Sequence, residues 1–438
     1  MVTKQSLPFR TTIRPFLKTQ IKKYLPLEAI NYLYHFPVAL MGVLFHFYPA
    51  RNLTVIGVTG TSGKTTVVSI IYHLLKKAGL AVSMVSTIQA IIGDKEYDTG
   101  FHVTNPDPWQ LQKYFQQAVK AGSKYFVLEI TSHGLAQFRN IGAHIDLGIV
   151  TNVTHEHLDY HKTFKNYLLT KAKIFSGVKY SIINRDDKNF RLLKNLSSGR
   201  VVSFGIKNDA DYTPAKYPFV TNLTGEFNKY NCLAAICAAK ILGLSDELIK
   251  KSLVNIPALP GRMEEVKLGQ NFRIFIDFAH KPDALEKVLQ TSLKKPHKRI
   301  IVMFGVAGLR DKAKRPIMGE IATRLADISV FTAEDPRTEN LGSLINQIVQ
   351  GARRTNSKEI SERELVSINK KLPIQHLFLR VPDRKKAINL LINKIAQKGD
   401  IILFCGKGHE KSMCFGTTEF PWDEKKEIVD SLKDNAKK

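Results

Sequence analysis

Short hydrophobic segments alternate with amphipathic segments along most of this 438-residue chain. Runs rich in β-branched residues predict buried strands, and hydrophobic residues spaced three or four positions apart predict helices. Strands are expected at 53–58, 82–86, 125–130, 145–150, 180–184, 201–204, 272–278, 299–304, 328–332, 376–378 and 400–405. Helices are expected at 107–122, 225–256, 282–293, 315–325, 341–354 and 383–397. The alternation predicts an α/β fold with parallel sheets.

A Pro- and Gly-rich segment, Ile256-Pro-Ala-Leu-Pro-Gly261, interrupts this pattern and is typical of a linker. A chain of 438 residues is also too long for one ordinary domain. We therefore expect an amino-terminal extension over 1–50, a central parallel-sheet domain over 51–257 and a smaller, doubly wound Rossmann-like domain over 258–438.

The extension is basic at first and hydrophobic afterwards. Before Glu28 there is no acidic residue, and the basic residues are Lys4, Arg10, Arg14, Lys18, Lys22 and Lys23. The hydrophobic run over 36–48 is shorter than the ~20 residues that cross a bilayer. It predicts either a helix packed on the next domain or a segment lying on the inner membrane surface. The extension lacks the pattern of a signal peptide, which indicates a cytoplasmic protein.

The chain is strongly basic, with 65 Lys and Arg against 39 Asp and Glu, a net charge of +26. Such a charge is compatible with binding of nucleic acid, a membrane surface or a polyanionic substrate. The sequence contains no recognised nucleic-acid-binding module, so we do not expect a nucleic-acid partner. The four cysteines have neither zinc-site nor disulfide spacing and are expected to be reduced residues of the core: Cys232, Cys237, Cys405 and Cys414.

The segment 53–66 combines a predicted strand, a turn of small residues and the start of a helix. Backbone N–H groups of such a turn bind phosphate, a lysine adds positive charge, and a threonine hydroxyl reaches Mg²⁺. The pattern GxxGxxGKT is a variant of the P-loop, because Val58 stands where the strict pattern has glycine. We predict a nucleotide phosphate site at Gly60, Thr61, Ser62, Gly63, Lys64, Thr65 and Thr66.

Polar residues follow several other predicted strands. Glu129 ends the strand at 125–130, where a carboxylate is placed to hold Mg²⁺. The segment 151–161 carries three histidines and two acidic residues without the spacing of a zinc protease, which indicates metal or phosphate binding. In the second half, polar clusters follow four strands, at 277–280, 305–312, 334–337 and 406–410. Because active groups of doubly wound sheets lie at the carboxyl ends of strands, we expect these clusters to share one crevice.

Taken in order, these motifs resemble those of the Mur ligase family, especially its UDP-N-acetylmuramoyl-tripeptide synthetase type. The resemblance extends from about residue 51 to 425 and rests on Gly60-Thr-Ser-Gly-Lys-Thr-Thr66, Glu129-Ile-Thr-Ser-His133, Asn152 with His157-Leu-Asp-Tyr-His161, Gly261-Arg-Met-Glu264, Asp277-Phe-Ala-His-Lys-Pro-Asp283, Glu334-Asp-Pro-Arg337 and Gly406-Lys-Gly-His-Glu410. It implies a ligase that uses ATP and Mg²⁺. The γ-phosphate of ATP would activate a substrate carboxylate as an acyl-phosphate, which the amine of an amino acid would then attack.

The resemblance also implies roles for individual residues. The catalytic set would be Lys64, Glu129, His157 and Lys171, with Thr65, Glu129, His157 and Lys171 near Mg²⁺ and Lys171 carbamylated; Lys173 fits that spacing less well. ATP would also contact Asn228, Arg262, Asp277 and His280. The acceptor would contact Thr104, Asn105, Thr131, Ser132 and Arg139, and the incoming amino acid Arg310, Glu334, Asp335, Arg337, Gly406 and Glu410.

The implied reaction adds a diamino acid to UDP-N-acetylmuramoyl-L-alanyl-D-glutamate in peptidoglycan precursor synthesis, in a monomeric enzyme. Arg337 favours meso-diaminopimelate, because lysine-adding relatives lack an equivalent arginine. The chain departs from the family in three places. Its extension is about half as long as the domain that binds uridine diphosphate, Glu334-Asp335 replaces Asp-Asn, and Thr104-Asn105 replaces Thr-Thr. A lipid-linked acceptor is therefore an alternative.

Two other functions remain as hypotheses. One is a ligase similar to folylpolyglutamate synthetase that uses another γ-glutamyl acceptor. The other is a P-loop protein without ligase activity that binds nucleic acid or a membrane surface.

Overall fold

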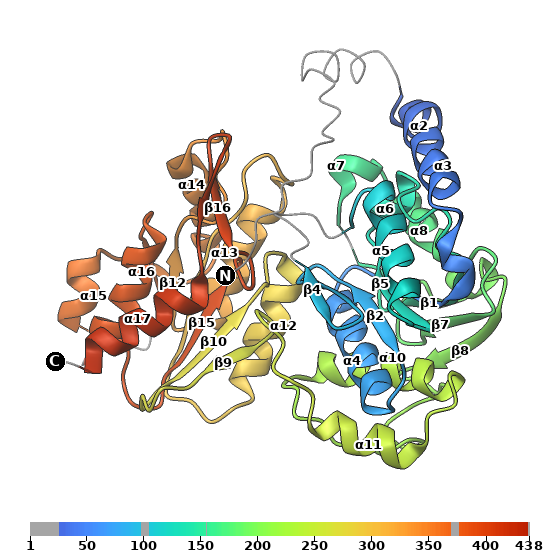
Figure 1. Cartoon of the computed structure of the whole chain (residues 1–438). Coiled ribbons are helices and arrows are strands. Elements are labelled where there is room, and N and C mark those ends of the chain that lie inside the picture. The colour runs from blue at the N-terminus through green and yellow to red at the C-terminus, as the bar shows by residue number, and fades with distance from the viewer. Residues whose placement is uncertain (1–25, 98–104, 155, 369–375, 437–438) are drawn as a thin grey trace.

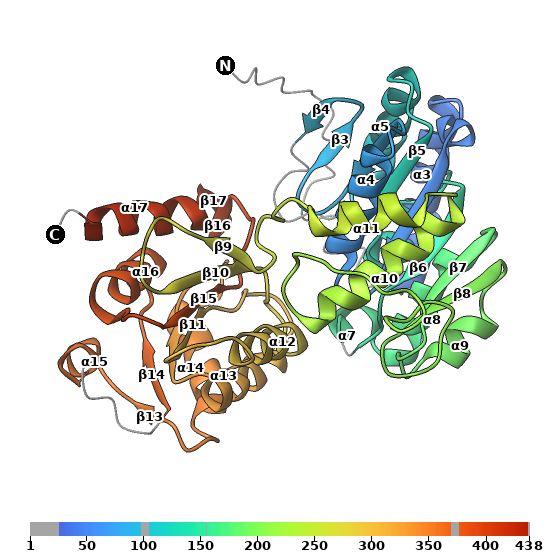
Figure 2. The same ribbon diagram turned by 90° about the horizontal axis from the view of Figure 1, so that it is seen from below.

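The computed structural model describes residues 26–97, 105–154, 156–368 and 376–436. Two α/β units lie side by side in both views, one over about 54–254 and the other over about 264–436 (Figures 1 and 2). Each unit is built around its own mostly parallel sheet, with helices on both faces. The predicted α/β class is confirmed.

Within the described residues, the first unit has an eight-stranded sheet in the order β4-β3-β2-β5-β1-β6-β7-β8. Its strands are β1 (Thr54–Thr59), β2 (Val82–Val85), β3 (Ala90–Ile92), β4 (Lys95–Tyr97), β5 (Tyr125–Glu129), β6 (Ile145–Val150), β7 (Tyr180–Asn184) and β8 (Arg200–Phe204). All neighbouring strands from β2 to β8 in this order are parallel, and β3 and β4 add an antiparallel edge.

The alternation of side chains along β1 explains how helices cover both faces of this sheet. Val55 belongs to one core and Ile56 and Val58 belong to the other. The core around Val55 contains α5 (Pro108–Lys120), α8 (Phe164–Ala172) and α9 (Phe190–Asn195). The opposite core contains α4 (Lys64–Lys77), α10 (Glu226–Ile241) and α11 (Asp246–Val254). Two short helices, α6 (Ser132–Ala136) and α7 (Leu158–His161), follow β5 and β6 at the carboxyl edge of the sheet.

The described part of the extension forms one continuous helical rod beside α5. It consists of α2 (Leu27–Ile30), a wider turn at Asn31–His35 and α3 (Phe36–Phe45). Ala39, Gly42 and Val43 are buried, and the rod packs on Trp109 of α5. One side of the hydrophobic run is therefore packed on the next domain, as one of the two interpretations predicts. No helix among the described residues is long and hydrophobic enough to span a membrane.

The second unit has a sheet in the order β13-β14-β12-β11-β15-β10-β9, parallel except for β9. The strands are β9 (Glu264–Val266), β10 (Arg273–Asp277), β11 (Ile300–Phe304), β12 (Ile328–Phe331), β13 (Lys358–Glu359), β14 (Leu377–Arg380) and β15 (Ile401–Cys405), followed by the hairpin β16 (Ser412–Phe415) and β17 (Thr418–Pro421). One face is covered by α12 (Pro282–Leu293), α13 (Lys314–Leu325) and α14 (Leu341–Ala352), the other by α15 (Glu362–Ile368), α16 (Arg384–Leu390) and α17 (Glu424–Ala436).

Most predicted elements occur within one or two residues of their expected bounds, but two kinds of difference stand out. The helical segment expected over 225–256 is broken, because Gly243 has a positive φ of 83° and Ser245 caps a new helix, α11. The short strands β3, β4, β9 and β13, the hairpin and the helices α15 and α17 were not predicted. Most of these elements lie at sheet edges or on the outside of the second unit, where short polar segments carry little periodicity. The four cysteines are buried and reduced.

A buried ion pair joins α16 and α17 to the sheet of the second unit. Arg384 is 2% exposed and donates to Glu424 at 2.9 and 2.6 Å, and also to the carbonyl oxygens of Ala333 and Cys405. The Arg384 guanidinium is therefore hydrogen-bonded to buried protein groups that take the place of water.

We expect Glu424→Ala to lower the free energy of unfolding of this unit by about 3–5 kcal/mol, because it leaves the Arg384 charge buried without its carboxylate. The control is Glu427→Ala in the same helix turn, which removes a surface pair with Lys385 and is expected to cost less than ~1 kcal/mol. Thermal or urea unfolding followed by circular dichroism measures both. Equal effects of the two substitutions would contradict the assigned role of the buried pair.

Candidate active site

One large cavity of about 1470 Å³ lies between the two units. The predicted site residues that line it are Thr61, Ser62, Gly63, Lys64, Thr65, Thr66, Asn105, Glu129, Thr131, Arg139, His157, Arg262, Asp277, His280, Arg310, Glu334, Asp335, Arg337 and Glu410. Gly60, Ser132, Lys171, Asn228 and Gly406 lie outside its lining, and Thr104 lies outside the described residues. Strand ends from two sheets therefore converge on one space, as the doubly wound rule predicts.

The phosphate loop connects β1 to α4 and is held against the loop after β6. Asn152 accepts from the Ser62 N–H and donates to the Ser62 carbonyl, both at 3.0 Å. Two positions accept only glycine: a Cβ on Gly60 would lie 1.8 Å from the Thr151 hydroxyl oxygen, and a Cβ on Gly63 would lie 2.3 Å from Asn231. The motif glycines thus let the loop approach its neighbours closely.

Two lysines donate to the same carbonyl oxygen in this loop. Lys64 Nζ lies 3.0 Å from the Gly60 oxygen, and Lys171 Nζ lies 2.8 Å from it. Burial and then the charge of Lys281 lower the pKa of Lys64 to about 8. Burial, followed by Lys64, lowers the pKa of Lys171 well below its ordinary value. Lys173 is exposed and lies over the ring of Phe138, so Lys171 is the buried member of the two candidates.

Glu129 ends β5 beside the phosphate loop and is 1% exposed. Thr87 donates to both of its carboxylate oxygens, from the backbone N–H and the hydroxyl, each at 2.9 Å. Thr87 was not predicted as a site residue. It fixes the carboxylate so that the remaining lone pairs face the cavity.

His157 lies in the loop after β6, with its imidazole against the rings of His133 and Tyr167. Burial, together with the charge of Lys281, keeps the pKa of His157 low, so its imidazole is neutral and able to bind a metal through a ring nitrogen. Among the described residues, no group of three or more His, Cys, Asp or Glu side chains forms a metal cage. Thr65, Glu129 and His157 all line the cavity, and Mg²⁺ usually keeps water and substrate phosphate oxygens as most of its ligands, so their role as metal ligands stays a prediction.

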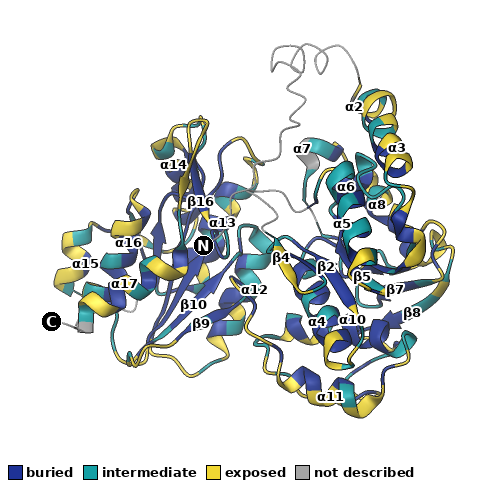
Figure 3. Cartoon of the chain, viewed as in Figure 1, coloured by how far each residue is buried: buried dark blue, intermediate teal, exposed yellow. Residues whose placement is uncertain are grey.

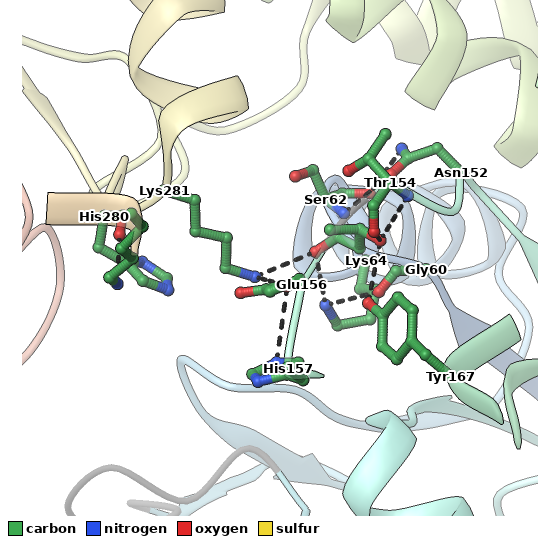
Figure 4. A network of polar contacts seen from close by, with 12 residues as sticks. Gly60, Ser62, Lys64, Asn152, Thr154, Glu156, His157, Tyr167, His280 and Lys281 are labelled. Carbon is green, nitrogen blue, oxygen red and sulfur yellow. Dashed lines mark hydrogen bonds and ion pairs between the residues drawn. The ribbon is translucent and has the colours of Figure 1, made fainter. Parts of the chain in front are cut away.

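Hydrogen bonds join the units across the cavity. Lys281, just before α12, is hydrogen-bonded to Glu156 and lies 3.4 Å from the Thr61 carbonyl oxygen in the phosphate loop (Figure 4). Arg262 Nη2 donates to the Thr65 hydroxyl at 3.1 Å. Although burial opposes it, the charge of Lys281 lowers the pKa of Glu156. Glu156 and Lys281 each lie within a motif of the sequence, but nothing in the sequence predicts that the two side chains contact each other.

Three further residues expected to contact ATP have well-defined partners. Asn228 and Asn231 are hydrogen-bonded at 2.9 Å near the start of α10. Asp277 accepts from two backbone N–H groups, and burial raises its pKa to about 6. His280 Nδ1 donates to the Phe278 carbonyl at 2.8 Å, which leaves Nε2 as its other polar atom.

The expected acceptor residues form a network around Asn105. Its side-chain oxygen accepts from the backbone N–H and the hydroxyl of Thr131, both at 2.6 Å, and its amide donates to the Glu129 carbonyl. Arg139 donates to the Asn105 carbonyl at 3.0 Å. The Ser132 hydroxyl oxygen is buried and has no hydrogen-bond partner in the described part of the chain. Asn105 therefore links the acceptor region directly to Glu129.

The opposite wall carries acidic groups around a buried lysine. Lys407 Nζ lies 2.9 Å from Asp335 and 2.6 Å from Glu410, and these carboxylates raise its pKa against the effect of burial. Glu334 is 5% exposed, and burial raises its pKa to about 7. Arg337 has a positive φ of 52° and donates to the Gly308 carbonyl. Lys407 is the residue of this cluster that sequence reasoning missed.

Comparisons with known proteins agree with this geometry. Residues 58–239 match the family described as the Mur ligase middle domain, and residues 261–408 match the Mur ligase, glutamate ligase domain. A UDP-N-acetylmuramoyl-L-alanyl-D-glutamate--2,6-diaminopimelate ligase of Clostridium acetobutylicum is 36% identical over 91% of this chain and 82% of the relative. The chain belongs to the Mur ligase family.

Two more members of the Mur ligase family support this placement. A 2,6-diaminopimelate ligase of Caldanaerobacter subterraneus subsp. tengcongensis with the same acceptor in its name is 34% identical over 91% of this chain and 82% of its own length. A solved structure of a UDP-N-acetylmuramoyl-L-alanyl-D-glutamate--2,6-diaminopimelate ligase superposes with a TM-score of 0.57, at 26% identity over 88% of this chain and 79% of that one.

The raised pKa of Glu334 predicts how the free energy of unfolding depends on pH. Its carboxyl titrates at about 7 in the folded protein against an ordinary value of 4.5. The stability that the neutral form contributes is complete below about pH 4.5 and is lost as the pH rises through 7. We expect Glu334→Gln to stabilise the ligand-free protein at high pH by on the order of 3 kcal/mol and to have little effect at low pH.

Unfolding free energies measured across this pH range test the prediction. Glu320→Gln, on the exposed face of α13, is the control and is expected to show no comparable pH dependence. A gain for Glu334→Gln that is the same at low and high pH would contradict the titration of Glu334.

Proposed function

We propose that this member of the Mur ligase family joins a carboxylate of a muramoyl-peptide acceptor to the amine of an amino acid, with ATP as the energy source. The observation that carries the proposal is the shared cavity. It contains a phosphate loop on one wall and an Arg and carboxylate cluster on the opposite wall. A ligase of this kind must hold a nucleotide, an acid and an amine within reach of one another.

In this mechanism the phosphate loop binds the triphosphate and Lys64 neutralises charge on the transferring phosphoryl group. Lys281 reaches the same loop from the second unit, so it adds positive charge only when the two units face each other closely. The acceptor carboxylate becomes an acyl-phosphate, the amine then attacks the carbonyl carbon, and phosphate leaves. Closure of the units around the substrates keeps water away from the acyl-phosphate.

Mg²⁺ would be held by the Thr65 hydroxyl on the nucleotide side and by Glu129 and His157 on the acceptor side. It would supply positive charge that offsets the repulsion between the acceptor carboxylate and the phosphates. Arg262 occupies the Thr65 hydroxyl at 3.1 Å, so that contact would yield when the metal and nucleotide bind.

Lys171 is proposed to act as a carbamate. Its low pKa supplies a neutral amine, which attacks carbon dioxide and loses a proton to form an anionic group. The anion would replace the buried neutral amine beside Lys64 and offset the charge of that lysine, and it would add a ligand oxygen at the acceptor-side metal. The electrostatics of the loop therefore favour the modified state.

The names of the relatives suggest UDP-N-acetylmuramoyl-L-alanyl-D-glutamate as the acceptor and meso-diaminopimelate as the amine. Arg310 and Arg337 would bind the carboxylates of the diamino acid, and Glu410 would accept from its distal ammonium. Asp335 and Lys407 hold Glu410 in place. We place the division between the units at residue 257 and the reaction in the cytoplasm, with the monomer as the active form.

Phosphate release from ATP tests the reaction and the amine together. The purified chain is supplied with Mg²⁺, the muramoyl-dipeptide acceptor and diaminopimelate, lysine or ornithine in turn. We expect stimulation by diaminopimelate, and Arg337→Ala should raise its KM about 10- to 100-fold because a charged hydrogen bond is lost. Lys64→Ala is the inactive control. Stimulation by lysine alone would reject diaminopimelate, and no release with any amine would reject this acceptor.

The carbamate has its own test. We expect Lys171→Ala to lower the turnover rate roughly a hundredfold or more, because a preorganised charge at the reaction centre is lost. Formate or acetate should restore part of the activity by placing a carboxylate in the vacated space. The control is Lys173→Ala, which changes an exposed lysine two residues away and should keep normal turnover. Full activity of Lys171→Ala, or absence of rescue, would contradict the carbamate.

A further inference from the structure

Much of the helical rod over Leu27–Phe45 is exposed (Figure 3), and many of its exposed side chains are large and hydrophobic. Its outer side and the turn that follows carry Tyr32, Leu33, Leu40, Met41, Leu44, Phe45 and Phe47, with exposed fractions between 39% and 80%. No Asp, Glu, Lys or Arg occurs from Ala29 to Ala50. A contiguous apolar surface of this kind marks an interaction site rather than an ordinary solvent face.

The exposed residues form a continuous stripe because of their spacing. Leu33, Leu40 and Leu44 are seven and four positions apart, which places them on one side of the rod, and Phe47 follows in the turn after α3. The opposite side is anchored, since Ala39 is fully buried and the buried Gly42 packs against the ring of Trp109. The rod therefore cannot turn its outer stripe inward without losing its packing on α5.

Positively charged residues precede and follow this hydrophobic stripe in the sequence. The sequence before Glu28 contains six basic residues and no acidic one. Exposed Arg51 follows the stripe directly. Lys173 lies over Phe138, whose ring also contacts Tyr32 and Phe36 of the rod. An apolar stripe bordered by cations and aromatic rings matches the chemistry of an anionic lipid surface, where hydrophobic side chains enter the acyl region and cations meet headgroups.

We propose that the rod over Leu27–Phe45 docks this protein peripherally on a bilayer that contains anionic lipids. A second copy of the chain is the less suitable occupant, because the basic residues before the rod would repel their counterparts in a symmetric contact. The rod packs beside the wall of the first unit that carries Arg139 and Thr131, through Phe138. Docking would therefore hold the acceptor side of the cavity near the membrane surface. This inference does not depend on the proposed ligase reaction.

Trp109 provides a built-in probe for docking. The chain has two tryptophans, and Trp422 lies in the second unit, where it donates to Glu424. In a Trp422→Phe variant of the full chain, we expect lipids brominated in the acyl chain to quench Trp109 in vesicles of phosphatidylcholine and phosphatidylglycerol. Vesicles of phosphatidylcholine alone should give little quenching, and added salt should weaken binding.

Co-sedimentation with the same vesicles tests which residues bind. Leu33→Gln with Leu44→Gln should lower the affinity more than about tenfold, since two apolar side chains no longer leave water. Replacing Lys18, Lys22 and Lys23 with Gln should lower it on the order of a hundredfold. The matched control is Val220→Gln with Leu268→Gln, which changes two equally exposed hydrophobic residues away from the rod and should bind as the unchanged chain does.

Three results would overturn the proposal: no binding to anionic vesicles, equal binding to neutral vesicles, or normal binding by the Leu33 and Leu44 variant. Sedimentation velocity without lipid adds a fourth. A dimer that this variant abolishes would assign the stripe to a second copy of the chain instead.

Discussion

Several lysine side chains are buried close together at the phosphate loop. The Gly60 carbonyl oxygen accepts from both Lys64 and Lys171, and Lys281 approaches the next carbonyl from the other unit. Burial lowers the pKa values of Lys64 and Lys171, and the charge of Lys281 adds to this at Lys64 and that of Lys64 at Lys171. A bound polyanion offsets these positive charges, so the same lysines give the loop an affinity for phosphates. The glycines at 60 and 63 are required because the loop must approach Thr151 and Asn231 to gather these charges.

The cavity depends on how two sheets are oriented. In each unit the parallel strands present their carboxyl ends at one edge, and the two edges face each other. Direct contacts across the space include those of Lys281 with Glu156 and of Arg262 with Thr65. Both contacts involve the nucleotide loop or its neighbour, so nucleotide binding and the relative position of the units are linked. This linkage gives a physical reason for a reaction that requires closure.

The cluster of Asp335, Lys407 and Glu410 in the second unit is more rigid than a simple substrate pocket. Lys407 is fully buried between Asp335 and Glu410, and Asp335 also accepts from the Cys414 N–H. The wall therefore orders its carboxylates before any substrate arrives, at the cost of burying a cation that needs both partners. Glu334 stands beside this group as a buried carboxyl with a raised pKa, and a substrate ammonium is a natural partner for its ionised form.

The sequence by itself determined the class of the fold, the position of most strands and the phosphate loop, because local hydrophobic periodicity and the glycine spacing encode them. It also predicted that polar residues at strand ends would share one crevice, since parallel topology alone brings such ends together. It did not determine that Glu156 meets Lys281, that Thr87 orients Glu129, or that Asp335 and Glu410 share Lys407. Those partners lie 3 to 125 positions apart in the sequence, and the three long-range pairs among these contacts have no local signature. Only the tertiary structure decided them, because ion pairing and burial depend on which loops the two sheets bring face to face.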